Sequence, residues 1–242
     1  MRWLASRVLT TLLVVLATAP ALAGEPRHYP RGGPPAPSGP WLEQGAFRVQ
    51  LGMFSPSGDS EFWRDTEAVF TGDAGDLDGV QYGADVLWSV NRHMSLMFSF
   101  SYAGGSTTQY YDEPLLSDLG HTTELSVMPM TAALVFFPAG RNSVLNPYLG
   151  VGGGIYWWDY SESGYFWDFV NEEETFQTYA TDSEAFGFFL LAGLDIPVRP
   201  TWSFFVEGRW QEVNDDMADD FAGLGEADLS GFSLSGGFSW KF

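Results

Sequence analysis

Acidic residues dominate the side chains that could do chemistry. Two groups of aspartates lie close to glycine and offer the oxygen ligands that a hard cation such as Ca²⁺ prefers. They are Asp73, Asp76 and Asp78, and separately Asp215, Asp216, Asp219 and Asp220. Neither group has the ligand spacing of an EF-hand loop. A bound divalent cation is therefore a hypothesis for these segments, with simple solubility as the alternative. The sequence indicates no other cofactor.

Histidine is the second residue type that could do chemistry, as a general base. Of the three histidines, His28 lies in a proline-rich segment and His93 in a short turn. His121 lies near Ser117 and Asp118, which could support a base in acyl transfer or hydrolysis. No His-Ser pair occurs in the last predicted strands. We therefore expect an exposed loop histidine and no catalytic residue.

The elements that position these residues are clearest at the end of the chain. Residues 229–242 alternate strictly, with aromatic residues that include Trp240 and Phe242 on one face and Ser and Gly on the other. Alternation of this kind is the period of a β-strand. A face turned to water would normally carry Lys, Glu and Thr, whereas Ser and Gly suit a crowded polar interior. The pattern favours a strand whose aromatic face meets lipid.

Seven further segments alternate in the same way, which predicts an all-β domain over residues 45–242. The predicted strands are 46–54, 79–90, 94–103, 124–137, 146–157, 184–196, 201–212 and 229–242. Short connections at 91–93, 138–145 and 197–200 alternate with long ones near 55–78, 104–123, 158–183 and 213–228. All long loops then lie at one rim of the barrel, and both termini lie at the opposite rim. We expect an eight-stranded antiparallel up-and-down transmembrane β-barrel.

The fourth predicted strand contains Pro129, which has no N–H to donate to its neighbours. A closed barrel has no edge strand on which such a residue could be tolerated, so we expect a bulge at this position. The register of this strand is left open by the sequence.

The first residues indicate the compartment. Residues 1–23 have the basic start, apolar run and small-residue cleavage site of a signal peptide. Residues 24–44 are proline-rich and read as a periplasmic linker. No later apolar run is long enough for a membrane helix, so any crossing uses strands. The absence of cysteine excludes disulfides and thiolate chemistry. We expect an integral outer-membrane protein of a Gram-negative bacterium, with both barrel termini periplasmic.

Charge follows the same division of the chain. The formal net charge is −20, which argues against nucleic acid as a partner. The long connections, with Glu212 counted at the edge of the last one, hold 24 of the 31 acidic residues and one base, Arg64. Each short turn instead carries an arginine: Arg92, Arg141 or Arg199. The sequence thus predicts long acidic extracellular loops and short periplasmic turns.

Tryptophans near strand ends predict the two membrane interfaces, where an amphipathic ring is half hydrated. Trp202 and Trp210 share one strand face and lie about 26 Å apart along the strand. In a tilted strand this corresponds to a height of about 20 Å, which is close to that of the apolar band. We expect Trp88 and Trp240 at the periplasmic girdle and Trp157 at the outer girdle. Ordinary core aromatics are the alternative, although core residues would not favour strand ends.

Four charged residues alternate with apolar ones on the predicted strands: Arg48, Asp85, Glu207 and Arg209. A charge facing lipid near mid-bilayer costs up to about 2–4 kcal/mol, so we expect these side chains to point inward. The interior of an eight-stranded barrel is just wide enough for side chains. We expect a plug of paired charges rather than an open channel lined by them.

The chain resembles the small outer-membrane β-barrel family of OmpA-, OmpX- and OmpW-like proteins. The residues that carry the likeness are 146–156 (NPYLGVGGGIY), 186–195 (FGFFLLAGLD) and the final FSWKF, within a likeness spanning 46–242. In that family the terminal aromatic strand is recognised by the barrel-assembly machinery, which implies this role for Trp240 and Phe242. No peptidoglycan-binding domain follows the barrel, so the resemblance does not imply that role of OmpA.

We expect a structural, envelope-integrity or surface-interaction role without enzymatic activity. The first alternative is a narrow channel or carrier for small solutes. The second is a lipid A-modifying enzyme, a chemistry known on this architecture, in which His121 would be the base. The expected partners are outer-membrane lipid, lipopolysaccharide and the barrel-assembly machinery. The sequence identifies no extracellular partner, no oligomeric state and no conducting path.

Overall fold

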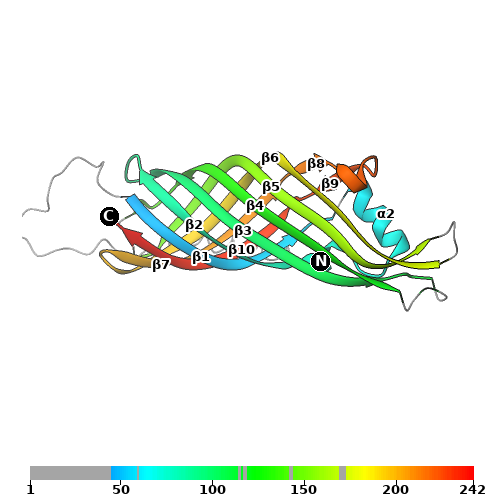
Figure 1. Cartoon of the computed structure of the whole chain (residues 1–242). Helices are drawn as coiled ribbons and strands as arrows, with labels where there is room; N and C mark the ends of the chain where they lie inside the picture. Colours follow the sequence, from blue (N-terminus) through cyan, green and yellow to red (C-terminus); the bar gives the residue numbers. More distant parts are fainter. Residues whose placement is uncertain (1–44, 59, 114–115, 117–118, 142–143, 169–172) are drawn as a thin grey trace, which may run out of the picture.

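The computed structural model is an elongated β-barrel (Figure 1). It describes residues 45–242 apart from 59, 114–115, 117–118, 142–143 and 169–172, so the predicted signal peptide and linker lie outside the described residues. The barrel strands are β1 (Gly45–Pro56), β2 (Gly79–Ser89), β3 (Met94–Tyr110), β4 (Gly120–Phe136), β5 (Asn146–Asp168), β6 (Glu173–Arg199), β7 (Trp202–Glu212) and β10 (Gly231–Lys241). They close in the order β1-β10-β7-β6-β5-β4-β3-β2, and neighbours are antiparallel. The predicted eight-stranded antiparallel barrel is confirmed.

A continuous belt of exposed apolar side chains surrounds the barrel. Its members lie at alternate positions of every barrel strand, as the two-residue period requires. The apolar belt includes Phe47, Leu51 and Met53 of β1, Tyr82 and Val86 of β2, Phe98 and Phe100 of β3, Met130 and Leu134 of β4, Val151 and Ile155 of β5, Phe186 and Leu190 of β6, Phe204 and Val206 of β7, and Leu234 and Phe238 of β10. Phe186 is 77% exposed and Leu51 is 64% exposed. So large an apolar surface marks an interaction with an apolar environment.

The strands differ in length, and four of them extend well past the belt. β1, β2, β7 and β10 have 11 or 12 residues, whereas β5 has 23 and β6 has 27. Much of the sequence predicted as the long connections 104–123 and 158–183 is therefore strand. Alternation continues there with its polarity reversed: Ser161 and Ser163 face outward on β5, while Trp158 and Tyr160 are buried on the inner face. A search for outward apolar residues ends such strands too early.

Pro129 does not produce the bulge expected from the sequence. The pairing of β3 with β4 keeps one register from Met94↔Phe136 to Tyr110↔Gly120, and only the bridges at Ser101 and Tyr102 are missing. On the other side, Pro129 pairs with Tyr156 in an unbroken ladder. The missing N–H thus interrupts one ladder locally without inserting a residue.

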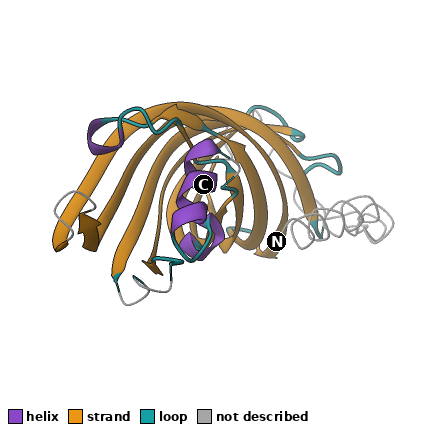
Figure 2. Ribbon diagram, turned by 90° about the vertical axis from the view of Figure 1, so that its right-hand side faces the viewer, coloured by secondary structure: helices purple, strands orange, loops and turns teal. Residues whose placement is uncertain are grey.

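The two longest connections fold into small elements at the long-loop end. They are α2 (Glu61–Val69), η2 (Ala74–Leu77), β8 (Asn214–Asp216), η3 (Asp219–Phe221) and β9 (Glu226–Asp228), with β8 and β9 paired. Figure 1 places α2, β8 and β9 opposite the C-terminus, and Figure 2 shows α2 within the arch of strands. Ser60 caps α2, since its side chain accepts a hydrogen bond from Trp63 N. We call these elements, with the parts of β3–β6 beyond the belt, the head.

Among the described residues, no helix is long and apolar enough to cross a membrane.

Candidate functional site

A network of charged side chains crosses the barrel at the level of the belt. Glu207 lies between two arginines: its Oε1 is 3.1 Å from Arg209 Nη2, and its Oε2 is 3.7 Å from Arg48 Nη1. Tyr148 donates its hydroxyl hydrogen to Glu207 Oε2 at 3.1 Å and accepts one from Arg48 Nη1 at 3.2 Å. These four residues form the mid-barrel network. Each is at most 3% exposed.

Asp85 lies beside this network through the strand register. It is directly opposite Arg48 in the pairing of β1 with β2. Gln50 donates from Nε2 to Asp85 Oδ1 at 3.3 Å, and Ser235 donates to Gln50 Oε1 at 2.9 Å. The small residues on the inner face of β10 thus face large polar neighbours, since Ser235 pairs with Glu207 across the strands. All four charged residues predicted to point inward lie in the interior.

Aromatic rings cover the guanidinium groups of the network. Arg48 lies 4.5 Å from the ring centre of Phe205 and 4.9 Å from that of Tyr148. Arg209 lies 4.4 Å from the ring centre of Phe189. Cation–π contacts of desolvated groups contribute more than exposed ones. The arginines are therefore held by a carboxylate on one side and by aromatic rings on the other.

A second polar layer lies nearer the short-turn end and is centred on Asp195. Lys241 Nζ is 3.8 Å from Asp195 Oδ2, and Asn146 Nδ2 donates to the same oxygen at 3.3 Å. Ser203 donates to Asp195 Oδ1. Because this carboxylate is buried, its three partners replace the water it loses.

The head has an apolar core of its own. Phe62 and Trp63 of α2 pack edge-to-face on Tyr160 of β5, with ring centres 5.4 and 5.7 Å apart, and Phe221 of η3 lies 5.2 Å from Tyr160. Trp63 Nε1 donates to Asp228 O at 3.2 Å, which ties α2 to β9. The connections predicted as loops thus fold over the barrel end as a packed cap.

His121 is buried in β4 and is not the exposed loop histidine expected from the sequence. Its ring stacks on Phe166 and meets the edge of Phe70, with centres 5.0 and 4.5 Å away. Its Nε2 is 3.9 Å from Glu162 Oε2. Burial lowers the pKa of His121 to about 4 and raises the pKa of Glu162, whose carboxyl accepts a hydrogen bond from Tyr160. Ser117 and Asp118 lie outside the described residues.

Three of the aspartates considered as Ca²⁺ ligands, Asp76, Asp215 and Asp220, accept hydrogen bonds from other residues. Asp76 accepts from Asp73 N in η2, and Asp78 ends that helix. Asp215 accepts from Trp158 Nε1 at 2.9 Å, and Asp220 accepts from Ala180 N at 3.0 Å. Asp216 N donates to Asp215, and Asp219 has a positive φ of 46°. Within the described part of the chain, no three acidic or histidine residues gather closely enough to hold a metal ion.

The tryptophans considered as girdles lie on the outer wall at two levels. Trp240 pairs directly with Trp202 and Phe47 at the short-turn end, where Trp88 lies opposite Gly45. Trp157 pairs with Glu184, to which its Nε1 donates at 3.1 Å, and Trp210 contacts Phe188 at the other level. Phe242 exchanges backbone hydrogen bonds with Gly45, which closes the barrel at the terminus.

Tyr148, Phe189, Phe205 and Tyr160 are site residues that sequence reasoning missed. Strand alternation predicts that the first three point into the interior. Their contacts with arginine could not be predicted, because these depend on the stagger between strands. Tyr160 and Glu162 lay in a segment read as a loop. Only the continued alternation of 158–164 could have shown that this segment is a strand.

No family model and no curated protein matches the chain. Solved structures do. The outer membrane protein OprG of Pseudomonas aeruginosa is 16% identical with a TM-score of 0.51, and the match covers 84% of this chain and 98% of that one. Neisserial surface protein A is 14% identical with a TM-score of 0.44, covering 82% and 97%. A major outer membrane protein of Thermus thermophilus is 10% identical with a TM-score of 0.46, covering 82% and 99%. With its closed ring of eight strands and the match to OprG, the chain has the fold of small eight-stranded outer-membrane β-barrels.

Proposed function

We propose that the protein is an integral outer-membrane β-barrel with a closed interior, which displays the acidic head at the cell surface in a structural or surface-interaction role. The apolar belt supports the membrane location, because exposed apolar residues at alternate positions of every barrel strand suit strands that face lipid. The fold shared with the outer membrane protein OprG also supports the membrane location. In this proposal the short turns face the periplasm.

The mid-barrel network is the observation that carries the closed interior. Arg48 of β1 and Tyr148 of β5 come from opposite sides of the ring and are joined by a hydrogen bond. Glu207 and Arg209 of β7 complete the network, and all four side chains are buried. A conducting path needs a continuous column of water, whereas these side chains bond to one another. The head core adds a second barrier, since Trp63 and Tyr160 pack within the arch of strands. Two successive barriers favour a scaffold for the head over a channel.

Planar-bilayer recording tests the closed interior. The full mature chain, shown to be folded by heat-modifiable gel migration, should give no steady conductance steps at 1 M KCl. A reconstituted porin in the same bilayers serves as the positive control. Regular steps from the folded protein would favour the narrow channel or carrier instead. Protease accessibility of the head on intact cells tests the orientation.

The proposal includes no enzymatic activity. A lipid A-modifying enzyme needs a base that reaches its substrate, whereas His121 lies between Phe70 and Phe166. Mass analysis of lipid A from cells with the protein, without it and with His121→Gln tests this. We expect three identical spectra, and a species that requires His121 would establish the enzyme.

A further inference from the structure

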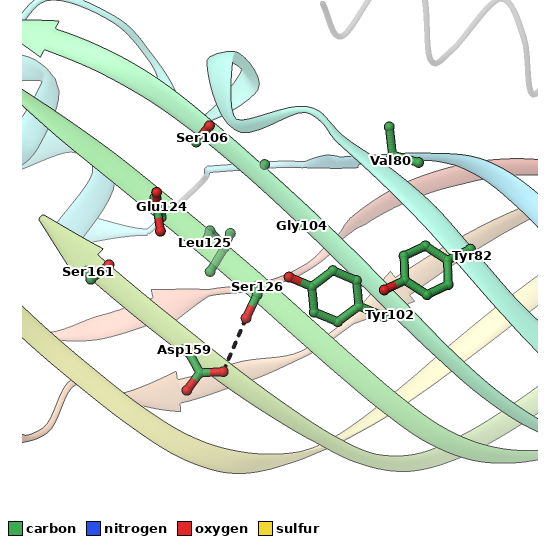
Figure 3. A pocket seen from close by; sticks show the side chains of 11 residues that line it. Val80, Tyr82, Tyr102, Gly104, Ser106, Glu124, Leu125, Ser126, Asp159 and Ser161 are labelled. Atoms are coloured by element: carbon green, nitrogen blue, oxygen red, sulfur yellow. Dashed lines mark hydrogen bonds between the residues drawn. The ribbon is translucent and has the colours of Figure 1, made fainter.

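A hollow of about 400 Å³ lies on the outer wall of the barrel, where the apolar belt meets the head. Strands β2 to β5 line it, and Figure 3 shows the rings of Tyr82 and Tyr102 on one side of it and the carboxylates of Glu124 and Asp159 on the other. We call it the outer-wall hollow. Its two sides have different chemistry, because it spans the level at which the outer face of the strands changes from apolar to polar.

The strand register builds the hollow in three rows. Tyr82 pairs with Tyr102 in the row nearest the belt. The next row runs Val80, Gly104, Ser126 and Asp159, and the third runs Ser106, Glu124 and Ser161. The small glycine and serine side chains of the second and third rows leave space between the tyrosines and the carboxylates. A Cβ at Gly104 would lie 2.8 Å from Tyr102 Oη, so a larger residue there would enter the hollow.

The two carboxylates of the hollow carry the same charge and lie near each other. Glu124 and Asp159 are diagonal neighbours on adjacent strands, about 7–8 Å apart. Asp159 also stands directly opposite Asp182 on the outer face, and like charges in such a pair destabilise a sheet. In the part of the chain that the structure describes, neither Glu124 nor Asp159 is in an ion pair. A cation in the hollow would relieve this repulsion.

The tyrosine pair adds a second feature that suits a cation. The rings of Tyr82 and Tyr102 are 5.3 Å apart and tilted by 35°, and Tyr82 is 54% exposed. Aromatic faces attract ammonium groups. An ammonium group that also has N–H donors can bond to the carboxylates and to the hydroxyls of Ser106 and Ser161. Rings, hydroxyls and carboxylates together fit a primary amine.

We propose that the outer-wall hollow binds a primary-amine group carried by a lipid of the outer leaflet, whose acyl chains lie along the apolar belt. The inference rests on the proposed function, because only a membrane-inserted barrel brings lipid to this level of the wall. The belt continues directly from Tyr102 to Phe100 and Phe98 on β3. A ligand anchored here therefore has its polar group beside the carboxylates and its apolar part against those rings.

Native mass spectrometry of the full mature chain tests the proposal. The protein is released from micelles that contain equimolar phosphatidylethanolamine, which is the probe for a primary amine, and phosphatidylglycerol, which has none, and bound lipids are counted. We expect about five to ten times more bound phosphatidylethanolamine, the size given by one cation–π contact and one surface ion pair together. The preference should disappear in Glu124→Gln/Asp159→Asn and in Gly104→Val.

Two matched variants control for charge and for bulk. Glu173→Gln/Glu174→Gln makes the same charge change at exposed positions near the strand tips. Gly236→Val adds the same side chain at an outward glycine where a Cβ would make only ordinary van der Waals contacts. Both should keep the preference. Loss of the preference in either control, or its persistence in the two hollow variants, would overturn the proposal.

Further outcomes separate the alternatives. Equal retention of the two lipids by folded wild-type protein would overturn this inference alone. Phosphatidylglycerol bound only with Ca²⁺, and released by EDTA, would assign the hollow to a bridging metal and overturn the amine. Protein without heat-modifiable migration and without bound lipid would overturn the proposed function as well.

Discussion

The belt and the head are two lengths of the same strands with opposite polarity. On β5, Val151 and Ile155 face outward within the belt, whereas Ser161 faces outward in the head. The inner face changes in the opposite sense, from the small Gly152 to the buried Tyr160. The two-residue period therefore indicates a strand in both lengths. Which face is apolar indicates what surrounds the strand, lipid at one level and water at the other.

The interior is charged in the belt and apolar in the head, and removal of the buried charge of Glu207 should give the largest effect. Glu207→Ala would leave Arg48 and Arg209 buried without their carboxylate. We expect a loss of about 3–5 kcal/mol in the free energy of unfolding, measured with urea in lipid vesicles. Glu207→Gln should lose less, because its carbonyl oxygen still accepts from Tyr148. The exposed Glu174→Ala is the reference, and equal losses in the two alanine variants would contradict a buried network.

One arginine placed at two heights on β5 tests the reversal of the outer face. Val151→Arg puts a charge in the belt and should cost about 2–4 kcal/mol in vesicles. Ser163→Arg puts the same charge on the outer face of the head, where we expect a change within about 0.5 kcal/mol. The measurement is again urea unfolding in vesicles. Similar losses at Val151 and Ser163 would show that both levels have the same surroundings.

The barrel could be predicted because its evidence is local. Strict alternation in 229–242 and the order of short and long connections were enough for strand number and topology. The strand ends could not be placed, because the search was for outward apolar residues and β5 loses these beyond Trp157. Helix α2 was missed inside a segment read as a loop, although Ser60 before Phe62 and Trp63 is a capping signal.

The candidate sites were accessible to prediction only in part. Alternation places Arg48 and Glu207 on inward faces, since the side of a strand follows from its period. Both residues contact Tyr148, which is 100 residues from Arg48 in the sequence. These contacts depend on the stagger of the strands in the closed barrel. No local pattern encodes that stagger. The outer-wall hollow was missed for the same reason, because its rows join Val80 to Asp159 across four strands.

The head should be the acid-sensitive region of the molecule because of His121. Burial lowers the pKa of His121 from 6.5 to about 4, so between these values the unfolded chain binds a proton that the folded head excludes. The stabilisation is complete above pH 6.5, decreases as the pH falls toward 4 and is constant below it. The total corresponds to about 3 kcal/mol. Glu162 acts in the opposite sense, since burial raises its pKa and the folded head takes up its proton first.

Hydrogen exchange of backbone amides at pH 7.5 and pH 4.5, corrected for intrinsic rates, measures this effect. We expect lower protection in α2 and at the outer end of β4 at pH 4.5, and unchanged protection in β7 within the belt. His121→Gln should remove most of the pH dependence, because its side chain does not ionise. Glu162→Gln should keep the His121 contribution and lose the opposing one, so its head should loosen more steeply with acid than that of the wild type. An equal loss of protection at pH 4.5 in the wild type and in His121→Gln would assign the acid sensitivity to other groups. The head and the belt would then differ in their packing and not in the titration of His121.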